Sequence, residues 1–472
     1  MNQAAGTTPD NTATTQTSAT TTMGGGTLVI TGARILGERE ADIVVVDGRI
    51  TEIAEPGAVA SADAEGARIV KAEGLVALPG FVDPHTHLRE PGREDTETIA
   101  TGARAAAAGG YTAVMAKANT TPVTDTASAA EWVYDKGLLA PHCDVHPVGS
   151  VTKGLAGEEL AELGLMANSR ARVRMFSDDG KCVHDPLLMR RALEYVTTFD
   201  GVIAQHSQDP RLAPHTSCCH EGPVSGRLGL PGWPAVAEES IIARDIMLAK
   251  AAGARLHVCH LSTAGSVELV RWGKAQGVQI TAEVTPHHLA LTVDLLESYD
   301  SVYKVNPPLR TMKDVEAVRA GLADGTIDVV GTDHAPHGLV DKQHDFQVAA
   351  FGMLGLETAL AVVSDVMVRP GRMSWADVAQ AMSVRPARLA GLEDQGRPLE
   401  VGEPANIALI DPEAVVTIDR DDSLSLSRNN PWHGRTLTGR VVTTILRGVP
   451  TYENGRIAAL DTPASAHRGA HA

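Results

Sequence analysis

The sequence has few cysteines, no long apolar run and no excess of basic residues. Only five cysteines occur among 472 residues, without C-x-x-C spacing, which argues against a disulfide framework and favours a reduced, cytoplasmic compartment. No apolar stretch reaches the roughly 18 residues of a membrane-spanning helix. The formal net charge of -17 argues against nucleic acid or an anionic membrane as a partner, because both need a basic face. A small anionic substrate remains compatible with a few local Arg or Lys side chains.

Both ends of the chain differ in composition from the rest. Residues 1–26 are mainly Thr, Ala, Ser and Gly, so they cannot bury enough apolar surface to offset the entropy of ordering. They also lack the cationic and apolar regions of a secretory signal. We therefore predict a disordered tail over 1–26, with Met23 as an alternative start, and a second flexible tail over 461–472.

Short β-rich runs lie next to both tails. One set falls within residues 27–76, where Asp47-Gly48 separates two apolar runs and predicts a hairpin turn. A similar set falls within 397–460. Because the two ends of a domain often lie close together, we expect both segments to form one small β-sandwich-like domain.

The middle of the chain, residues 77–396, alternates apolar strands with helical stretches such as Thr96–Ala108. This alternation predicts parallel βαβ units, and eight of them predict an α/β TIM (β/α)8 barrel, with a doubly wound open sheet as the structural alternative. The eight expected strands are Leu75–Asp83, Tyr111–Ala116, Asp144–Gly149, Arg172–Phe176, Gly201–His206, Arg255–His260, Gln279–Val284 and Ile327–Asp333.

Polar residues gather at the carboxyl ends of these strands, which favours the barrel because its active sites lie on that face. They are His85, His87, Asn119, Asp178, Asp179, His206, His260 and Asp333.

The pair His85 and His87 indicates a metal site. Residues two apart on a strand point the same way, so both imidazoles can bind one divalent ion. Such a pair alone is as compatible with a structural role as with metal binding. Two further histidines and Asp333 strengthen the metal interpretation and exceed the needs of one four-coordinate zinc. We therefore predict a two-metal site with Asp179 as the candidate bridge.

Several motifs, in this order along the chain, resemble the dihydroorotase family of the amidohydrolase superfamily. The residues 81–92 (FVDPHTHLREPG) resemble its first metal-binding signature and 332–337 (TDHAPH) its second. The stretches 176–180 (FSDDG), 257–263 (HVCHLST), 282–288 (AEVTPHH) and 304–310 (KVNPPLR) also fit. The resemblance covers residues 28–452 and is closest to the long bacterial type called class I.

This resemblance implies the metal ligands and their roles. The implied ligands are His85, His87, Asp179, His206, His260 and Asp333. They would hold two Zn²⁺ ions per subunit, although one-metal relatives leave the occupancy open. Asp333 would also be the catalytic general base and acid. Many superfamily members bridge their metals with a carbamylated lysine, but this chain has Ser-Asp-Asp-Gly at 177–180, so Asp179, rather than Asp178, is the expected bridge.

The resemblance also implies a group of substrate-binding residues. They are Arg89, Asn119, Asn306, His337, Phe351 and Gly352. The chemistry agrees for Arg89, because an Arg fork binds a carboxylate bidentately, and for the Asn side chains, which offer donors and acceptors to ring amides. One departure is Lys117, where the family usually has Met. This lysine could perturb the site, but we expect it to point to solvent.

The expected activity is the reversible hydrolysis and cyclisation of L-dihydroorotate and N-carbamoyl-L-aspartate in de novo pyrimidine biosynthesis, driven by a metal-activated water. Two alternatives stay open. One is another cyclic amidohydrolase, a hydantoinase or allantoinase, which Arg89 and the missing lysine disfavour. The other is a non-catalytic scaffold for aspartate transcarbamoylase, which the complete set of ligands disfavours. We expect a homo-oligomer, a dimer, and the sequence leaves open whether a complex with aspartate transcarbamoylase forms.

Overall fold

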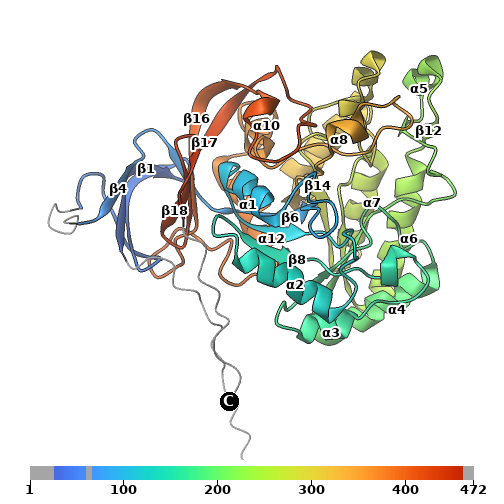
Figure 1. Ribbon diagram of the computed structural model, residues 1–472, viewed down its shortest axis with the longest axis horizontal. Helices are drawn as coiled ribbons and strands as arrows, with labels where there is room; N and C mark the ends of the chain where they lie inside the picture. Colours follow the sequence, from blue (N-terminus) through green and yellow to red (C-terminus); the bar gives the residue numbers. More distant parts are fainter. Residues whose placement is uncertain (1–25, 60–65, 461–472) are drawn as a thin grey trace, which may run out of the picture.

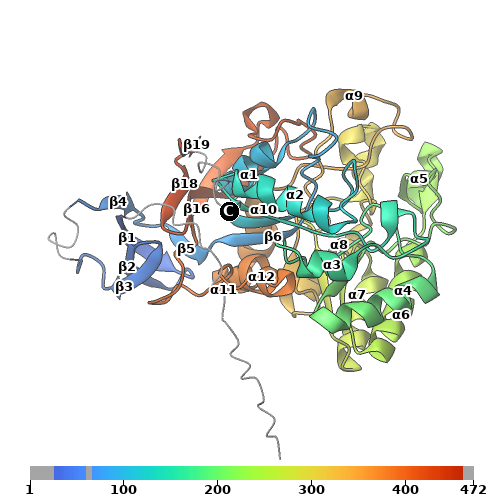
Figure 2. The same cartoon turned by 60° about the horizontal axis from the view of Figure 1, so that its bottom comes forward.

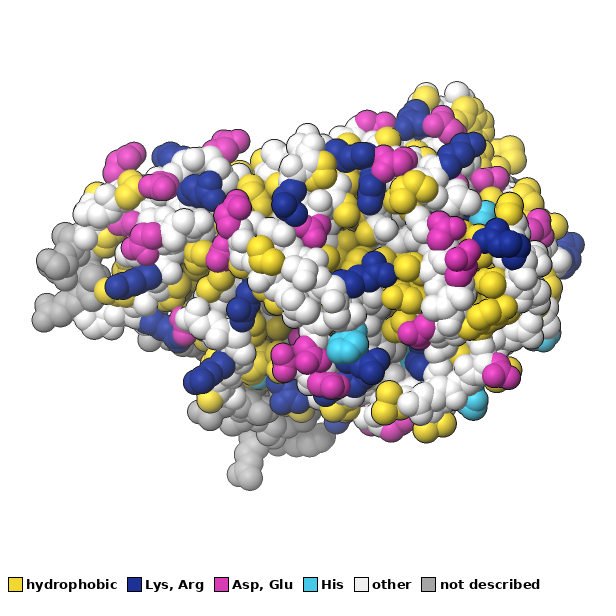
Figure 3. All heavy atoms as spheres, turned by 90° about the horizontal axis from the view of Figure 1, so that it is seen from above, with side chains coloured by type: hydrophobic (Ala, Val, Ile, Leu, Met, Phe, Trp, Pro, Cys, Tyr) yellow, Lys and Arg dark blue, Asp and Glu magenta, His cyan; other side chains and the backbone are white. Residues whose placement is uncertain are grey.

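The computed structural model describes residues 26–59 and 66–460. The predicted tails therefore lie outside the described residues, apart from Gly26. Within the described part, no helix is long and apolar enough to cross a membrane. The face seen in Figure 3 mixes Lys and Arg with Asp and Glu side chains over its whole extent.

A nine-stranded sheet combines both ends of the described chain (Figure 1). Its strands are β1 (Thr27–Ile35), β2 (Arg39–Val46), β3 (Arg49–Ala54), β4 (Arg68–Lys71), β5 (Val76–Pro79), β16 (Ile407–Thr417), β17 (Thr436–Leu446), β18 (Val449–Glu453) and β19 (Arg456–Ile457). The hydrogen-bonded order is β19-β18-β17-β16-β5-β1-β2-β3, and β4 pairs with β1. The antiparallel pair β5–β16 thus joins the N-terminal strands to the C-terminal ones.

This terminal sheet has its own apolar core, to which both ends of the chain contribute. Ile30 and Ile43 from the N-terminal strands are fully buried in it, together with Leu409 and Ile445 from the C-terminal strands. The β2–β3 hairpin turns at Asp47-Gly48, where both residues have positive φ, 49° and 79°. This is the turn that the Asp-Gly pair predicts, because its two central residues must adopt left-handed conformations.

Eight parallel strands form the barrel, as the sequence predicts. They are β6 (Phe81–Thr86), β7 (Tyr111–Ala116), β8 (Asp144–Pro147), β9 (Met175–Phe176), β10 (Val202–Gln205), β13 (Arg255–Val258), β14 (Ile280–Val284) and β15 (Val329–Val330). Continuous pairing connects β6-β7-β8 and β9-β10-β13-β14-β15. Single parallel bridges, Gly149–Phe176 and Thr86–His334, join the two groups at both junctions and complete the ring.

Helices surround the barrel strands (Figure 2). They are α1 (Ile99–Ala108), α2 (Ala127–Leu138), α3 (Leu163–Asn168), α4 (Pro186–Val196), α5 (Pro223–Leu228), α6 (Val236–Ala252), α7 (Ala264–Ala275), α8 (Met312–Ala323), α9 (Leu339–Lys342), α10 (Ala359–Val363), α11 (Trp375–Ala379) and α12 (Arg385–Ala390). A short parallel pair, β11 (Cys219–His220) and β12 (Gly232–Trp233), lies in a connection. The predicted helix over Thr96–Ala108 begins only at Ile99, because Thr98 caps it by accepting a hydrogen bond from the Thr101 amide.

The expected first barrel strand, Leu75–Asp83, is in fact two strands in two different sheets. β5 ends at Pro79 in the terminal sheet, and β6 begins at Phe81 in the barrel. Gly80 lies between them, where an added Cβ would stand 2.4 Å from the Thr112 methyl carbon. Both strands are buried throughout, so the apolar run in the sequence continues through the break and conceals it.

Candidate functional site

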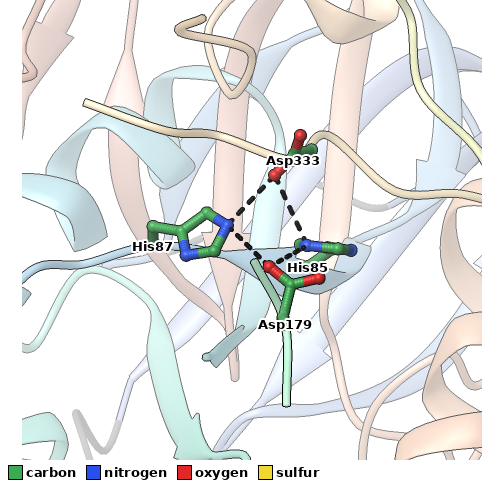
Figure 4. A group of neighbouring side chains, drawn as sticks. All are labelled: His85, His87, Asp179 and Asp333. Carbon is green, nitrogen blue, oxygen red and sulfur yellow. Dashed lines mark hydrogen bonds and ion pairs between the residues drawn. The ribbon is translucent and has the colours of Figure 1, made fainter. Parts of the chain in front are cut away.

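Four of the predicted ligands converge at the carboxyl end of the barrel (Figure 4). The Nε2 atoms of His85 and His87 each lie 3.2 Å from Oδ2 of Asp179. Oδ1 of Asp333 lies 3.1 Å from Nε2 of His87 and 3.4 Å from Nε2 of His85. All four side chains are buried. Two imidazole nitrogens and two carboxylate oxygens thus face one point, and they are donors that a divalent metal accepts.

A second group shares Asp179 with the first. Oδ1 of Asp179 lies 3.4 Å from Nε2 of His260 and 3.7 Å from Nδ1 of His206. These two ring nitrogens are 2.8 Å apart. Asp179 therefore turns one oxygen to each histidine pair. We refer to these six residues, His85, His87, Asp179, His206, His260 and Asp333, as the His–Asp cluster.

Asp178 has a different role from its neighbour. Its carboxylate accepts hydrogen bonds from the backbone amides of Val151 and Thr152, at 2.8 and 3.0 Å, and from the Thr152 hydroxyl. These bonds use its acceptor capacity to fasten the segment after β8 to the segment after β9. The structure thus places Asp179, and not Asp178, among the histidines.

The electrostatics of the His–Asp cluster favour a bound cation. Burial and the nearby Lys117 act to lower the pKa of His85, but Asp179, Glu283 and Asp333 raise it well above its ordinary value. Three buried atoms of the cluster have no hydrogen-bond partner among the described residues: Nε2 of His85, Oδ1 of Asp179 and Nδ1 of His260. Buried polar atoms without partners are costly, and for the first two a metal ion at the centre of the cluster would satisfy this need. These residues therefore fit a metal.

Glu283 supports the cluster from beneath, a role that the sequence analysis did not assign. Its Oε1 accepts hydrogen bonds from Nδ1 of His85 and from the His260 amide. Its Oε2 accepts one from Nε2 of His257. Burial would raise the pKa of Glu283, but His85 and His257 hold it well below its usual range. An ionised carboxylate behind a histidine fixes the ring tautomer and orientation that metal binding requires.

Two amide side chains support other histidines of the cluster. Nδ1 of His87 donates to Oδ1 of Asn119 at 2.9 Å. Nε2 of His206 donates to Oε1 of Gln208, also at 2.9 Å, and this oxygen accepts a second hydrogen bond from Nδ2 of Asn306 at 3.2 Å. Gln208 was not predicted, and its position two residues after His206 is the only sequence signal for it. Of the residues expected to bind substrate, Asn119 thus contacts a histidine of the cluster, and Asn306 contacts the support Gln208.

Three functional positions have strained backbones. Arg89, His260 and Asp333 have φ values of 61°, 31° and 49°. Non-glycine residues rarely adopt this left-handed region, and such strain gathers at functional sites. Each residue follows a barrel strand, so the strained conformation lets the chain leave the strand while its side chain stays at the barrel opening.

Arg89 and His337 meet beside the cluster. The Arg89 Nε donates to the carbonyl oxygen of Pro336 at 3.1 Å, and its Nη2 donates to Nε2 of His337 at 3.2 Å. Burial, helped by the positive charges of Arg89 and Lys342, lowers the pKa of His337 to about 3. His337 is therefore neutral and can accept this hydrogen bond. Nη1 and the second N–H of Nη2 remain to bind an anion.

The loop at Phe351 and Gly352 packs directly against His337. Gly352 has φ 143°, and an added Cβ would lie 2.8 Å from both Cδ2 of His337 and Cβ of Ala335. Only glycine fits this approach. The Phe351 ring lies beneath Nζ of Lys304, 4.3 Å from the ring centroid, a cation–π distance. The predicted residues Arg89, His337, Phe351 and Gly352 are thus brought together.

Asn429 fastens this region and comes from the far end of the chain, where no sequence signal singled it out. Its Oδ1 accepts from the His337 amide at 3.1 Å. Its Nδ2 donates to the carbonyl oxygens of Ala335 and Gly352 at 2.9 and 3.1 Å. A segment between β16 and β17 therefore reaches the barrel opening, although the sequence suggested only terminal-sheet residues there.

The expectation that Lys117 points to solvent is wrong. Its side chain is only 2% exposed, and its Nζ lies 3.5 Å from Sγ of Cys259. Lys117 directly follows β7 and Cys259 directly follows β13, so their contact places the lysine side chain in the barrel interior.

Comparisons with known proteins place the chain in a family. Residues 74–266 match the family described as dihydro-orotase-like, and residues 234–451 match the amidohydrolase family. Among solved structures, an L-hydantoinase (dihydropyrimidinase) from Arthrobacter aurescens is 25% identical with a TM-score of 0.80, covering 92% of this chain and 97% of its own. A dihydropyrimidinase from Brevibacillus agri, 22% identical with a TM-score of 0.79 over 91% of this chain and 96% of its own, shares the fold. Fold and site define a metal-dependent cyclic amidohydrolase.

The curated relatives are more specific. A dihydroorotase of Leifsonia xyli is 56% identical over 431 residues, covering 91% of this chain and 97% of the relative. A dihydroorotase of Mycobacterium tuberculosis is 54% identical over 433 residues, covering 92% of this chain and 100% of the relative. The chain therefore belongs to the dihydroorotase family.

Proposed function

We propose that this chain is a dihydroorotase, which opens the ring of L-dihydroorotate to N-carbamoyl-L-aspartate and closes it again in pyrimidine biosynthesis. The observation that carries the proposal is the position of Arg89, an anion-binding fork, beside a buried His–Asp cluster. A cluster alone suits many hydrolases. A cationic fork next to it suits a cyclic amide that bears a carboxylate.

The cluster is proposed to hold two zinc ions. His85, His87 and Asp333 would bind the first, and His206 and His260 the second. Asp179 would bridge them, because it turns Oδ2 to the first group and Oδ1 to the second. Bound zinc supplies a lowered pKa for water and polarisation of the ring carbonyl. The convergence of buried imidazoles and carboxylates supports this assignment, since nitrogen and oxygen donors suit zinc.

Asp333 is the proposed general base and acid. Burial would raise its pKa, but His85 and His87 lower it below its ordinary value, so the carboxylate is ionised near neutral pH. An ionised carboxylate at the centre of the cluster can accept the proton of the attacking water. In the ring-opening direction it then gives this proton to the leaving ring nitrogen, and cyclisation reverses both transfers.

The substrate group, defined as Arg89, Asn119, Asn306, His337, Phe351 and Gly352, is proposed to orient the ring. Arg89 would bind the carboxylate with its remaining N–H groups. Oδ1 of Asn306 is buried and has no partner among the described residues, which suits an acceptor for a ring N–H. Backbone groups near Phe351 would border the ring on the side of His337.

Assembly and location are proposed on a different basis. A homodimer, alone or in complex with aspartate transcarbamoylase, follows from the family resemblance. A cytoplasmic location is supported by the cysteines: all five lie in the described residues, and none of them forms a disulfide there.

A spectrophotometric assay tests the function. The protein is stripped with a chelator, reloaded with zinc, and assayed with L-dihydroorotate, hydantoin and allantoin. We expect ring opening of dihydroorotate that chelation abolishes and zinc restores. Turnover of hydantoin or allantoin instead would indicate the other cyclic amidohydrolases. A protein that binds zinc poorly and turns over none of the three would support the scaffold alternative.

A further inference from the structure

Lys117 stands inside the barrel, next to the cluster. Its backbone amide donates to the Thr86 carbonyl oxygen at 2.9 Å, which fixes it beside β6, the strand that carries His85. Its Nζ lies 3.5 Å from Sγ of Cys259, and Cys259 immediately precedes His260. The ammonium group therefore contacts a side chain that neighbours His85 in space and precedes His260 in the chain.

The same layer contains Glu283. Ligand atoms of His85, Cys259 and Glu283 all lie within 4.8 Å of one another, so the ammonium that contacts Cys259 borders the support of His85. Among the described residues, no carboxylate lies within the 4.0 Å ion-pair distance of its Nζ. The positive charge is thus not neutralised by one partner, and in a buried site its field extends to the whole cluster.

This charge persists in the folded protein. Burial would lower the pKa of Lys117, but Cys259, Asp179 and Glu283 raise it above its ordinary value. In return, Lys117 helps to hold the pKa of Asp179 below its usual range. It also opposes protonation of His85. Because the ammonium is buried within the layer beside the cluster, its positive charge repels every cation that binds there.

The balance of buried charge decides which metal position is affected. Asp179, Asp333 and Glu283 carry three negative charges, and Lys117 reduces their sum to minus two. One divalent ion balances this sum, and a second leaves an excess of two positive charges. The first position has four converging side chains, whereas the second has only Asp179, His206 and His260. The second position is thus the weaker one, and it includes the neighbour of Cys259.

We propose that Lys117 is an internal cation that weakens binding of the second metal and so favours occupancy of the first position alone when free zinc is scarce. The proposal rests on the two-metal site proposed above. It implies that two metal positions in one cluster differ in affinity because of a residue that binds neither ion.

Zinc titration tests this role without measuring activity. Wild type, Lys117→Met and Lys117→Arg are stripped of metal and titrated with Zn²⁺ against a chromophoric chelator. Met keeps the length of the side chain without its charge, so the second dissociation constant should fall at least tenfold, by about 1.4 kcal/mol or more, and the first should change less. Arg keeps the charge and should resemble wild type. His206→Ala identifies the second step by removing it, and Lys250→Met, an exposed lysine of α6, controls for net charge.

The outcomes separate this proposal from the proposed function. Equal second affinities in wild type and Lys117→Met, with matching thermal melting, would overturn the role of Lys117 but leave the metal site intact. Failure of every protein to bind zinc would overturn both. If Lys117→Arg also bound the second zinc ion more tightly than wild type, the proposal would be contradicted. The shape of the side chain, and not its charge, would then determine the second affinity. Lys117→Gln replaces Lys117→Met if that variant does not fold.

Discussion

The two parts of the site are built differently. The His–Asp cluster stands on barrel strands or directly after them, and buried groups such as Glu283 support it. The substrate group stands on loops, and residues distant in sequence, such as Asn429, hold those loops in place. A cluster fixed by strands tolerates little change, whereas loops fixed by a few hydrogen bonds can vary. We therefore expect changes in the cluster to abolish turnover or metal binding, and changes in the substrate group to alter affinity.

The largest effect is expected for Asp333→Asn. The amide cannot accept the proton of water, so kcat should fall by about 10³-fold or more, within the usual range of general acid–base catalysis. Zinc content, measured by elemental analysis alongside kcat, should fall much less than activity, because His85 and His87 remain. A loss below tenfold with zinc retained would remove Asp333 from the catalytic role.

A smaller effect is expected for Glu283→Gln, which keeps the shape of the support but removes its charge. Zinc affinity should fall by about 10- to 100-fold, as is usual when a partner of a metal-binding histidine is lost. Competition with a chelator measures this. Glu268→Gln, at an exposed site on α7, is the matched control and should bind zinc like wild type. Unchanged affinity in Glu283→Gln would show that the cluster does not need this support.

Arg89→Lys probes the substrate group. Lysine keeps the charge but loses the planar fork, and a hydrogen bond to a charged group contributes about 1.5–3 kcal/mol. The KM for L-dihydroorotate should therefore rise about 10- to 100-fold while kcat and zinc content change little. Steady-state kinetics provide the measurement, with Arg93→Lys as the control. A lower kcat at unchanged KM would place Arg89 with the cluster and contradict the comparison.

The smallest effect concerns His337 and acid stability. The folded protein holds the pKa of His337 at about 3 through burial, whereas the unfolded chain titrates near 6.5. Between these values the unfolded state binds more protons, so the free energy of unfolding decreases as the pH falls below 6.5. His337→Gln lacks this loss, which amounts to about 2 kcal/mol at most by pH 5. Urea unfolding of both proteins from pH 7.5 to pH 5 should give diverging curves, and parallel curves would contradict the burial of His337.

The barrel and the six residues of the cluster could be predicted because strand ends and strand alternation are local properties. The break at Gly80 could not, since both strands beside it are fully buried and read as one apolar run. The residues that support the site could not be predicted either, because they act through contacts between distant parts of the chain. Glu283 contacts His85 across 198 residues, and Asn429 contacts His337 across 92 residues. Lys117 is an intermediate case. Its place at a strand end put it close to the site, but the cost of burying a charge favours a solvent-exposed lysine, and the sequence holds no signal for the contact with Cys259 that buries it.

The most direct test of the account compares two substrates of the zinc-loaded protein. L-dihydroorotate and 5,6-dihydrouracil share the ring amide that the His–Asp cluster would attack, but only the first has the carboxylate that Arg89 would bind. The account predicts kcat/KM at least about 100-fold higher for dihydroorotate, because a site built for a charged group rejects an analogue without it. It also predicts that this ratio shrinks in Arg89→Lys. Equal turnover of both rings by wild type, or a preference for dihydrouracil, would contradict it.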